Sequence, residues 1–370
     1  MTAAGAYVHI PFCAAKCDYC DFFSVVVPDA VRRQVLAVML DEIGQWQDRE
    51  VGTVYIGGGN PGLLTDSELI RLVTVINQAW RVPPKAEWTI EMRPETVTRA
   101  RCDLLRGLGI TRISVGVQSF LDTERAALGR GGNDGDLRRA LELLAAEWDN
   151  WNIDLIYGLP GQTPASWQES LVAARGYRPP HVSLYDLTLG EDTLLTRRVN
   201  EGSVLLPDED DTVRMLRAAQ ETLAAGGYEQ YEVSNWAQPG FRCRHNVNYW
   251  RGCDYIGIGP GAVSTWQGKR WRRCEDLAAY LASRGCAAED EEIIDDAIRR
   301  REAVILGLRM ADGIDRCEFS ERFGSDPVLQ FPAAVARWQQ SGDLAYDDVR
   351  LWITAQGMRW SSAIIADLME

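Results

Sequence analysis

The fold is decided in residues 7–24, which read YVHIPFCAAKCDYCDFFS. A short apolar run of the kind that forms a strand leads into three cysteines, Cys13, Cys17 and Cys20, with the spacing Cys-x3-Cys-x2-Cys. Three thiolates at this spacing can hold three irons of a four-iron cluster, and the fourth iron is then left without a protein ligand. An open metal position is a place for chemistry, whereas a site closed by four protein ligands is structural. We therefore predict a [4Fe-4S] cluster bound by these three cysteines.

Two simpler explanations of the cysteines compete with the cluster. A structural zinc site normally takes four protein ligands, often as two Cys-x2-Cys pairs, and the sequence has no second pair. His9 could supply a fourth ligand, but it alternates within the apparent strand. The other explanation is a chance grouping of buried thiols. The neighbouring Phe12, Phe22 and Phe23 favour the cluster, because apolar side chains restrict solvent around such a group.

Composition limits the classes of partner and compartment. The chain has 370 residues, a formal net charge of −14 and no run of Lys or Arg, which argues against nucleic-acid binding and against attachment to anionic lipid. No apolar run reaches membrane-spanning length, and MTAAGAYVHI leads directly into a strand, so we expect no signal peptide. The nine cysteines and an oxygen-sensitive cluster indicate a reducing cytoplasm. Four scattered cysteines are expected to be core or surface thiols: Cys102, Cys274, Cys286 and Cys317.

The first 240 residues alternate short strand-like runs with helical patterns, as in a parallel sheet with right-handed crossovers. Strands are expected at 7–10, 53–58, 87–92, 112–118, 151–158, 181–187 and 228–234. Helices are expected at 29–48, 65–79, 97–106, 134–147, 164–174 and 208–225. Asp29 and Thr65 are the predicted N-caps of the first two helices. The sequence thus predicts an α/β fold, a partial (β/α)6-type barrel, with functional residues at the carboxyl ends of its strands.

After residue 240 the pattern changes, and two domains are expected: the barrel over residues 1–240 and a smaller, mostly helical α+β domain over residues 241–370. Residues 243–266 are rich in Gly and aromatic side chains and are predicted to form an ordered loop. The remaining elements are expected to be helices at 275–284, 290–310, 315–323 and 327–340, a hairpin at 344–354 and a closing helix at 357–370.

Glycine or polar residues follow several of the predicted strands. Residues 57–62 read GGGNPG, and glycines at such a turn let the backbone approach a ligand while its N–H groups bind an anionic group. Glu91, Gln118 and Asp154 end later strands, and Arg130 lies in a glycine-rich turn. Taken singly, each is better explained as a solvated strand end or a cap. Their recurrence at strand ends favours one shared site for a ligand with mixed polar groups.

Several motifs occur in an order that resembles the radical S-adenosylmethionine (SAM) enzymes. After the cysteine stretch come GGGNP, GVQSF, DLIYGLPGQT, HVSLYDLT, GYEQYEVSNWA and HNVNYW, all within residues 7–266. Among these enzymes the chain resembles the oxygen-independent coproporphyrinogen III oxidase-like family, and within it the haem chaperones called HemW. The resemblance implies that SAM chelates the open iron. It also implies SAM contacts for nine residues, which are Tyr7, Tyr19, Gly58, Gly59, Asn60, Glu91, Gln118, Arg130 and Asp154.

The chain departs from that family at four positions. Asn60 stands where Thr is usual, and Gly62 stands where Ser is frequent. Gly132 occupies a position that often carries His, and Val263 one that usually carries His or an equivalent. Because Asn keeps a polar side chain, we expect the SAM contact at residue 60 to persist.

Two features distinguish the HemW branch from the oxidases. Phe22 occupies the position at which the oxidases carry a fourth cysteine. Residues 245–250, HNVNYW, reproduce an HNxxYW motif that the oxidases lack. In the HemW branch this motif implies haem binding, with the imidazole of His245 as an iron ligand and Tyr249 and Trp250 against the macrocycle.

Two alternatives to this haem ligand remain open. His245 could be a structural histidine that is hydrogen-bonded within an aromatic loop. Cys243 and Cys253 flank the motif, and either could supply a thiolate ligand instead. The local sequence CRHN is not the Cys-x-x-Cys-His pattern of covalent haem attachment.

The leading hypothesis is a cytoplasmic haem chaperone that binds haem and passes it to haem-requiring apoproteins. The cluster and SAM would then serve dimerisation, redox control or transfer rather than porphyrin oxidation, and a homodimer is one expected assembly. Three alternatives are weighed against it. Phe22 disfavours an oxygen-independent coproporphyrinogen III oxidase, and HNVNYW disfavours a radical SAM methyltransferase. An electron carrier would need four protein ligands for its cluster.

Overall fold

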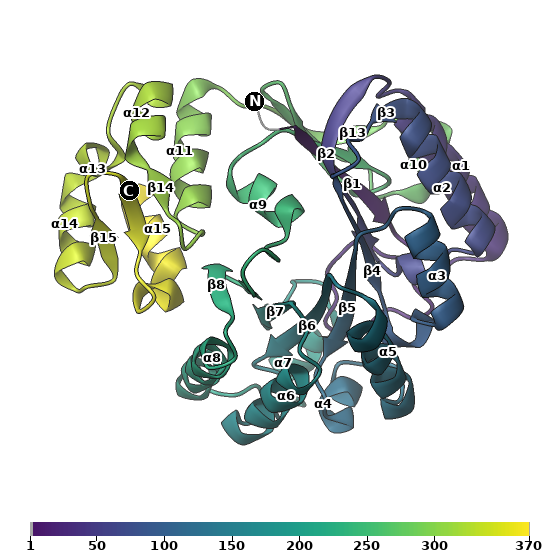
Figure 1. Cartoon of the computed structure of the whole chain (residues 1–370), viewed down its shortest axis with the longest axis horizontal. Coiled ribbons are helices and arrows are strands. Elements are labelled where there is room, and N and C mark those ends of the chain that lie inside the picture. The colour runs from purple at the N-terminus through teal and green to yellow at the C-terminus, as the bar shows by residue number, and fades with distance from the viewer. Residues whose placement is uncertain (1–2, 370) are drawn as a thin grey trace.

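A curved sheet organises the molecule, whose computed structural model describes residues 3–369 (Figure 1). Six strands run parallel in the order β1 (Ala4–Ile10), β2 (Arg49–Gly58), β4 (Glu87–Met92), β5 (Arg112–Gln118), β6 (Trp151–Tyr157) and β7 (His181–Asp186). The first and last of these strands do not pair with each other, because each has a further strand on its outer side. The predicted α/β fold with a partial barrel is therefore confirmed.

Helices cover the outer face of the sheet (Figure 1). The six predicted helices are α1 (Asp29–Gly44), α2 (Asp66–Ala79), α3 (Arg99–Gly107), α5 (Asp134–Glu147), α6 (Pro164–Gly176) and α8 (Glu209–Ala224), and two short helices are added, α4 (Asp122–Ala127) and α7 (Leu194–Asn200). Helix α2 begins as predicted, because Thr65 and Glu68 cap each other's backbone N–H groups at 3.3 and 2.8 Å. The predicted N-cap of α1 is wrong, since Pro28 holds that position and Asp29 is the first helical residue.

The sheet extends beyond the barrel strands on both sides. Beside β7 lie the antiparallel strands β9 (Asn235–Ala237) and β8 (Glu229–Glu232). On the other side, β10 (Tyr255–Ile258) runs parallel to β1 and is followed by the antiparallel strands β11 (Val263–Trp266), β12 (Lys269–Arg273) and β13 (Ala288–Ile293). Two further elements of the large sheet region are β3 (Trp80–Arg81), which pairs with β2, and the helix α10 (Leu277–Ala282).

Two predictions for this region are wrong. Residues 243–266 do not form a loop, because they contain the helix α9 (Arg244–Trp250) and the strands β10 and β11. The helix expected at 290–310 is shorter, α11 (Asp296–Gly307), and β13 precedes it. Cross-strand ion pairs explain the second difference, since Arg270 on β12 contacts Glu292 on β13 at 3.3 Å. Such pairing with a neighbouring strand overrides the weak strand preference of acidic residues.

The last part of the chain has a hydrophobic core of its own, separate from the core of the large sheet. It contains α11 and the elements β14 (Ile314–Asp315), α12 (Arg316–Phe323), α13 (Pro327–Gln330), α14 (Pro332–Gln340), β15 (Leu344–Tyr346), β16 (Arg350–Ile353) and α15 (Ser361–Met369). The predicted hairpin and closing helix are confirmed as β15–β16 and α15. The short 3-10 helices are η1 (Pro61–Leu63), η2 (Pro94–Thr96) and η3 (Gly357–Trp360).

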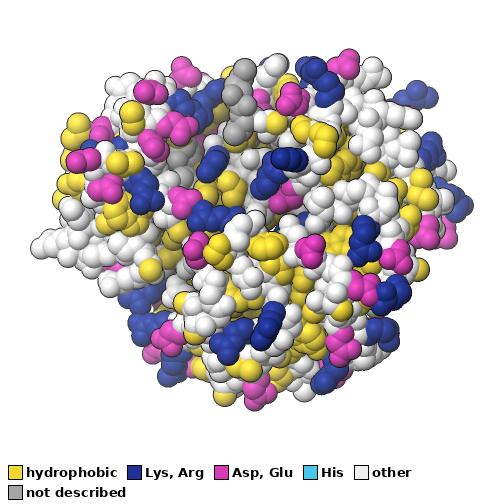
Figure 2. All heavy atoms as spheres, in the orientation of Figure 1, with side chains coloured by type: hydrophobic (Ala, Val, Ile, Leu, Met, Phe, Trp, Pro, Cys, Tyr) yellow, Lys and Arg dark blue, Asp and Glu magenta, His cyan; other side chains and the backbone are white. Residues whose placement is uncertain are grey.

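Tryptophan side chains fill part of the core, and charged side chains of both signs cover the surface. The chain has 13 tryptophans. Trp151, Trp167 and Trp236 are among the largest fully buried side chains, so part of this tryptophan content fills the interior. Figure 2 shows Lys and Arg interspersed with Asp and Glu over the face in view, without an extended area of one sign. No helix within residues 3–369 combines the length and the apolar character needed to cross a membrane.

Candidate cofactor site

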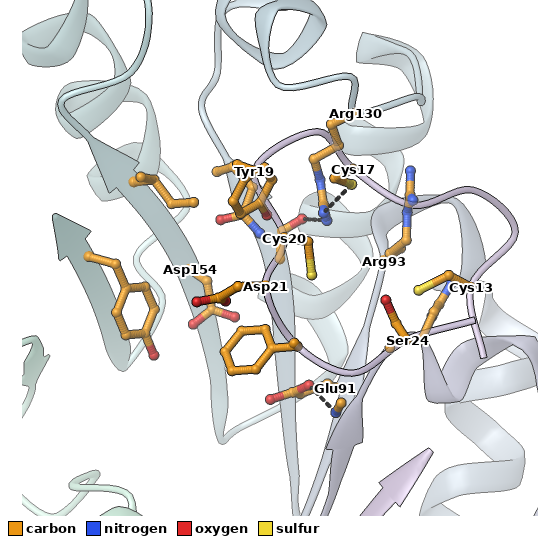
Figure 3. Close-up of a pocket in the computed structure, with 18 of the residues that line it drawn as sticks. Cys13, Cys17, Tyr19, Cys20, Asp21, Ser24, Glu91, Arg93, Arg130 and Asp154 are labelled. Carbon is orange, nitrogen blue, oxygen red and sulfur yellow. Dashed lines mark hydrogen bonds between the residues drawn. The ribbon is translucent and has the colours of Figure 1, made fainter. Parts of the chain in front are cut away.

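The three predicted cluster ligands line a single cavity of about 350 Å³ (Figure 3). They lie on the loop that joins β1 to α1. Backbone hydrogen bonds fold this loop: the Cys13 N–H donates to the Val25 carbonyl at 2.9 Å, the Val25 N–H donates to the Pro11 carbonyl at 2.7 Å, and the Cys20 N–H donates to the Cys17 carbonyl at 3.2 Å. All three cysteines are partly buried. The loop thus presents three thiols to one enclosed space.

The chemistry of these donors fits a cluster with one open iron. Burial raises the pKa of the Cys13 and Cys20 thiols, so these thiols carry protons at neutral pH until a metal displaces them. The guanidinium of Arg130 offsets the charge of the resulting thiolates, because its Nη1 lies 4.0 Å from the sulfur of Cys17. Within residues 3–369, no three side chains of His, Cys, Asp or Glu are arranged to share one metal ion. The cysteines are instead spread around the wall of a cavity.

The glycine turn after β2 lies against the cysteine loop. A Cβ atom at Gly59 would come within 2.7 Å of the Phe12 carbonyl oxygen, and one at Gly58, whose φ is 109°, within 2.6 Å of the His9 ring. Only glycine permits this approach. The expectation that the N–H groups here are free to bind a ligand anion is not met by three of them, because the Gly58 N–H donates to the Glu91 carboxylate at 3.0 Å and two others donate to backbone carbonyls. The Gly59 and Asn60 N–H groups donate to the Ile10 and Phe12 carbonyls at 2.8 Å, so the contact between the two loops already uses them.

Two carboxyl groups face the cavity from β4 and β6, the strands on either side of β5. Glu91 accepts hydrogen bonds from the Tyr55 hydroxyl at 2.8 Å and the Gly58 N–H at 3.0 Å. Asp154 accepts from Ser114 at 3.0 Å and from Asn152 at 2.7 Å. Burial, together with the charge of Asp154, raises the pKa of Glu91 to about 7, and burial also raises the pKa of Asp154. The pair is therefore poised to hold hydroxyl groups or a cationic ligand.

The next strand and turn add a cation and an amide. Gln118 ends β5 at a φ of 69°, next to an irregularity in the β5–β6 ladder that falls between Gly116 and Gln118. Arg130 donates to the Gly116 carbonyl, and a Cβ atom at Gly116 would lie 2.9 Å from both side chains. The left-handed backbone at Gln118 is a strained conformation of the kind found at ligand sites.

Eight of the nine predicted SAM residues line the cavity that holds the cysteines. They are Tyr19, Gly58, Gly59, Asn60, Glu91, Gln118, Arg130 and Asp154. Asp154 was expected at a strand end, but it is the fourth of seven residues in β6. Tyr7 lines a second, adjoining cavity of about 560 Å³ instead. The two cavities share a wall made by Asp21, Phe22, Tyr55 and Glu91.

Sequence reasoning missed Arg93, which lines the cavity beside Cys13 (Figure 3). Its Nη2 donates to the Gly131 carbonyl at 2.8 Å, and its Nε lies 2.6 Å from Glu95. The charge of Arg93 partly offsets the effect of burial on the pKa of the Cys13 thiol. The sequence feature that could have identified Arg93 as a site residue is its position directly after β4, two residues beyond Glu91.

The expected apolar cover of the cysteines is confirmed only in part. Phe12 is buried beneath the cysteine loop, whereas the side chain of Phe22 is 65% exposed. Among the four scattered cysteines, Cys102 and Cys274 are buried and Cys286 and Cys317 are exposed, as expected for core and surface thiols.

The second cavity contains the motif that implied haem binding. His245 and Tyr249 line it from α9. The His245 ring is buried, with Nδ1 at 2.9 Å from the Thr53 hydroxyl and Nε2 at 3.1 Å from the Tyr249 hydroxyl. Burial, with a smaller effect of the Arg112 charge, lowers the pKa of His245 to about 3, so the imidazole is neutral. Cys243 is fully buried and is not among the residues that line either cavity.

Family models match both parts of the chain. The model of the radical SAM superfamily matches residues 7–173, and the model of the HemN C-terminal domain matches residues 294–360. The fold is similar to coproporphyrinogen III oxidase (HemN) from Escherichia coli, a radical SAM enzyme, with a TM-score of 0.87, 22% identity, and coverage of 99% of this chain and 90% of that chain. Fold and site thus define a radical SAM protein, a class whose members imply a [4Fe-4S] cluster and SAM.

Curated relatives narrow this class. The chain is 36% identical over 331 residues to the haem chaperone HemW of Synechocystis sp., covering 85% of this chain and 80% of the relative. It is 32% identical to HemW of Mycobacterium tuberculosis, covering 99% and 94%, and 38% identical to HemW of Escherichia coli, covering 69% and 68%. The chain belongs to the HemW haem chaperone family.

Proposed function

We propose that this chain is a haem chaperone that binds haem, passes it to haem-requiring apoproteins, and carries a [4Fe-4S] cluster and SAM. The observation that carries the proposal is the pair of cavities with a common wall. One cavity is lined by the three cysteines, and the other is lined by His245 and Tyr249. The identity to relatives named haem chaperones supports the same conclusion.

In the first cavity, Cys13, Cys17 and Cys20 hold the cluster, which when bound supplies an open iron for the amino and carboxylate groups of SAM. Arg130 offsets negative charge beside Cys17. Glu91 and Asp154 present acceptors to the remaining polar groups of SAM. The other SAM contacts proposed are Tyr19, Gly58, Gly59, Asn60 and Gln118, with Tyr7 reaching SAM from the second cavity.

In the second cavity, His245 is the proposed haem ligand. Its Nε2 is 3.1 Å from the Tyr249 hydroxyl, so Tyr249 would have to release the imidazole for it to hold haem iron. The burial that lowers the pKa of His245 to about 3 keeps the imidazole unprotonated, as a metal ligand must be. Cys243 is a weaker candidate because burial raises the pKa of its thiol to about 12.

We propose that the structural boundary of the C-terminal domain lies near residue 294 rather than residue 240. The large sheet continues through β13, and the separate C-terminal core begins with α11. The matched HemN C-terminal region also starts at residue 294. The cytoplasmic location and the homodimer stay predictions.

Anaerobic reconstitution of the cluster, followed by haem titration, tests the proposal. We expect wild type to take up haem in a ratio fixed by its sites, and His245→Gln to weaken uptake at least about tenfold. The matched control is His181→Gln, because His181 is also buried, with ring nitrogens at 2.6 Å from Asn152 and 2.9 Å from Tyr231, but it lines neither cavity. Equal weakening by both variants would contradict the haem role of His245. Anaerobic incubation with coproporphyrinogen III should give no protoporphyrinogen, and its formation would favour an oxidase.

A further inference from the structure

The wall of the second cavity has a distinctive distribution of aromatic and charged side chains. Tyr249 meets His245 and Tyr255 edge-on, at ring-centroid distances of 4.8 and 4.6 Å, and Tyr55 lies 5.1 Å from His245. These four rings give one side of the cavity an aromatic wall, in which Tyr249 stands nearly perpendicular to its two neighbours. The cavity volume of about 560 Å³ lies within the range of cofactor sites. It suits a planar ligand with one apolar edge.

The charges around this recess are of one sign. Asp21, Glu91 and Glu275 line the cavity, and none of the described residues that line it is Lys or Arg. Glu275 forms an ion pair with Arg272 at 2.9 Å, but Arg272 is not part of the lining. The Glu91 carboxyl, whose pKa is raised to about 7 by burial and by the charge of Asp154, is about half ionised at neutral pH. The inside of the cavity therefore repels an anionic group and offers it no cation.

Haem has an apolar edge, which carries its vinyl groups, and an opposite edge, which carries two ionised propionates. We infer that haem enters this cavity with its vinyl edge first and keeps both propionates at the mouth, in contact with solvent. The inference rests on the proposed function and adds the orientation of the ligand. The aromatic wall accepts the apolar edge, whereas burying the propionates would set two carboxylates against carboxylates without a compensating cation.

This orientation has a consequence for transfer. The propionates protrude, so a recipient apoprotein with Lys or Arg side chains at its own haem site can contact them before the haem leaves this chain. The exposed side chain of Phe22 lies in the wall of the second cavity, so this cavity reaches solvent and leaves room for this contact. Haem then does not have to reverse its orientation during the transfer to the recipient.

The test compares three porphyrins on the cluster-reconstituted full chain, in one cosolvent. Haem and haem dimethyl ester should bind within about threefold of each other, because the propionate charges lie outside the cavity. Deuterohaem 2,4-disulfonate carries charge on the opposite edge and should bind at least about tenfold more weakly than haem. If haem dimethyl ester lost affinity while the disulfonate kept it, the proposed orientation would be wrong, but the proposed function would stand. Failure of all three to bind would overturn the proposed function with it.

A pair of variants extends the test to the protein. Glu275→Gln removes a carboxylate from the cavity wall and should reduce the penalty on the disulfonate by at least about threefold. Glu291→Gln removes an exposed carboxylate from β13 and should leave the three affinities unchanged. Equal effects of the two variants, or no effect of Glu275→Gln, would contradict the proposed position of the vinyl edge.

Discussion

The carboxylate of Glu87 on β4 accepts the backbone N–H of His245 on α9 at 3.0 Å, across 158 residues of sequence. The same carboxylate accepts the Arg244 N–H at 3.1 Å, and the Cys243 thiol lies 3.5 Å from it. Cys243, the residue at the N-cap position, makes no side-chain capping bond of its own. The sheet therefore supplies the cap of α9, and the position of His245 depends on β4.

Replacing Glu87 by Ala should disturb both stability and haem uptake. Two helix N–H groups and a thiol would lose a buried acceptor, and we expect the free energy of unfolding to fall by about 1–3 kcal/mol. Urea unfolding measures this loss, and haem titration measures the displacement of His245. Thr65→Ala is the matched control, because it removes the cap of α2 at a cost of about 1 kcal/mol but leaves α9 intact. Unchanged haem uptake in Glu87→Ala would contradict the positioning role.

Each of the cysteines of the loop should be needed for the cluster. Cys13→Ala, Cys17→Ala and Cys20→Ala each remove one of three thiolate ligands, so we expect most of the reconstituted iron to be lost. Iron and inorganic sulfide per chain are the measurement. Cys286→Ala is the control, because its thiol is exposed and does not line the cavity. A full complement of iron in any of the three loop variants would argue against that cysteine as a ligand.

Removing the Tyr249 hydroxyl should strengthen haem binding if His245 is the ligand. The hydroxyl holds His245 Nε2 at 3.1 Å and competes with iron for it, so Tyr249→Phe should lower the dissociation constant several-fold. A neutral hydrogen bond contributes about 1 kcal/mol, which corresponds to about fivefold. The haem spectrum should keep the features of imidazole ligation. Weaker binding in Tyr249→Phe would instead indicate that the hydroxyl contacts haem directly.

The parts of the site that local sequence determines could be predicted. The spacing of Cys13, Cys17 and Cys20 requires only a short loop, and apolar runs separated by helical patterns are sufficient to indicate parallel strands. The helix at residues 244–250 was missed because its cap comes from Glu87, far away in the sequence. No local pattern reports such a contact.

The prediction for the N–H groups of the glycine turn differs from the structure for a related reason. These N–H groups looked available in sequence, but the Gly59 N–H donates to Ile10 in the folded chain. Tyr7 was assigned to SAM by resemblance, and the structure puts it in the adjoining cavity. Tyr55 and Glu91 separate the two cavities, and the curvature of the sheet decides which cavity a residue faces. The order of the strands does not specify this curvature.

The raised pKa of Glu91 predicts a dependence of stability on pH. In the unfolded chain this carboxyl loses its proton near its ordinary pKa of 4.5, whereas in the folded chain it does so at about 7. Between these values the folded state binds more protons, so the Glu91 contribution to stability falls as pH rises through this window. Glu91→Gln removes the titration. Relative to wild type, the free energy of unfolding of this variant before reconstitution should rise by about 1–3 kcal/mol between pH 5 and pH 8. A difference that does not change with pH would contradict the shift.

Gly62 should not tolerate the serine that its family often carries. A Cβ atom there would lie within 2.7 Å of Thr96 Cβ and closer still to Thr96 Oγ1, which donates to the Arg93 carbonyl at 2.7 Å. We expect Gly62→Ser to lower the free energy of unfolding by about 1–3 kcal/mol, because η1 and η2 must separate. Thr96→Ala removes the closer of the two contacts, so the double variant should recover about 1 kcal/mol relative to the sum of the single changes. Urea unfolding of the four proteins gives this coupling, and strictly additive changes would show that the two residues do not compete for the same space.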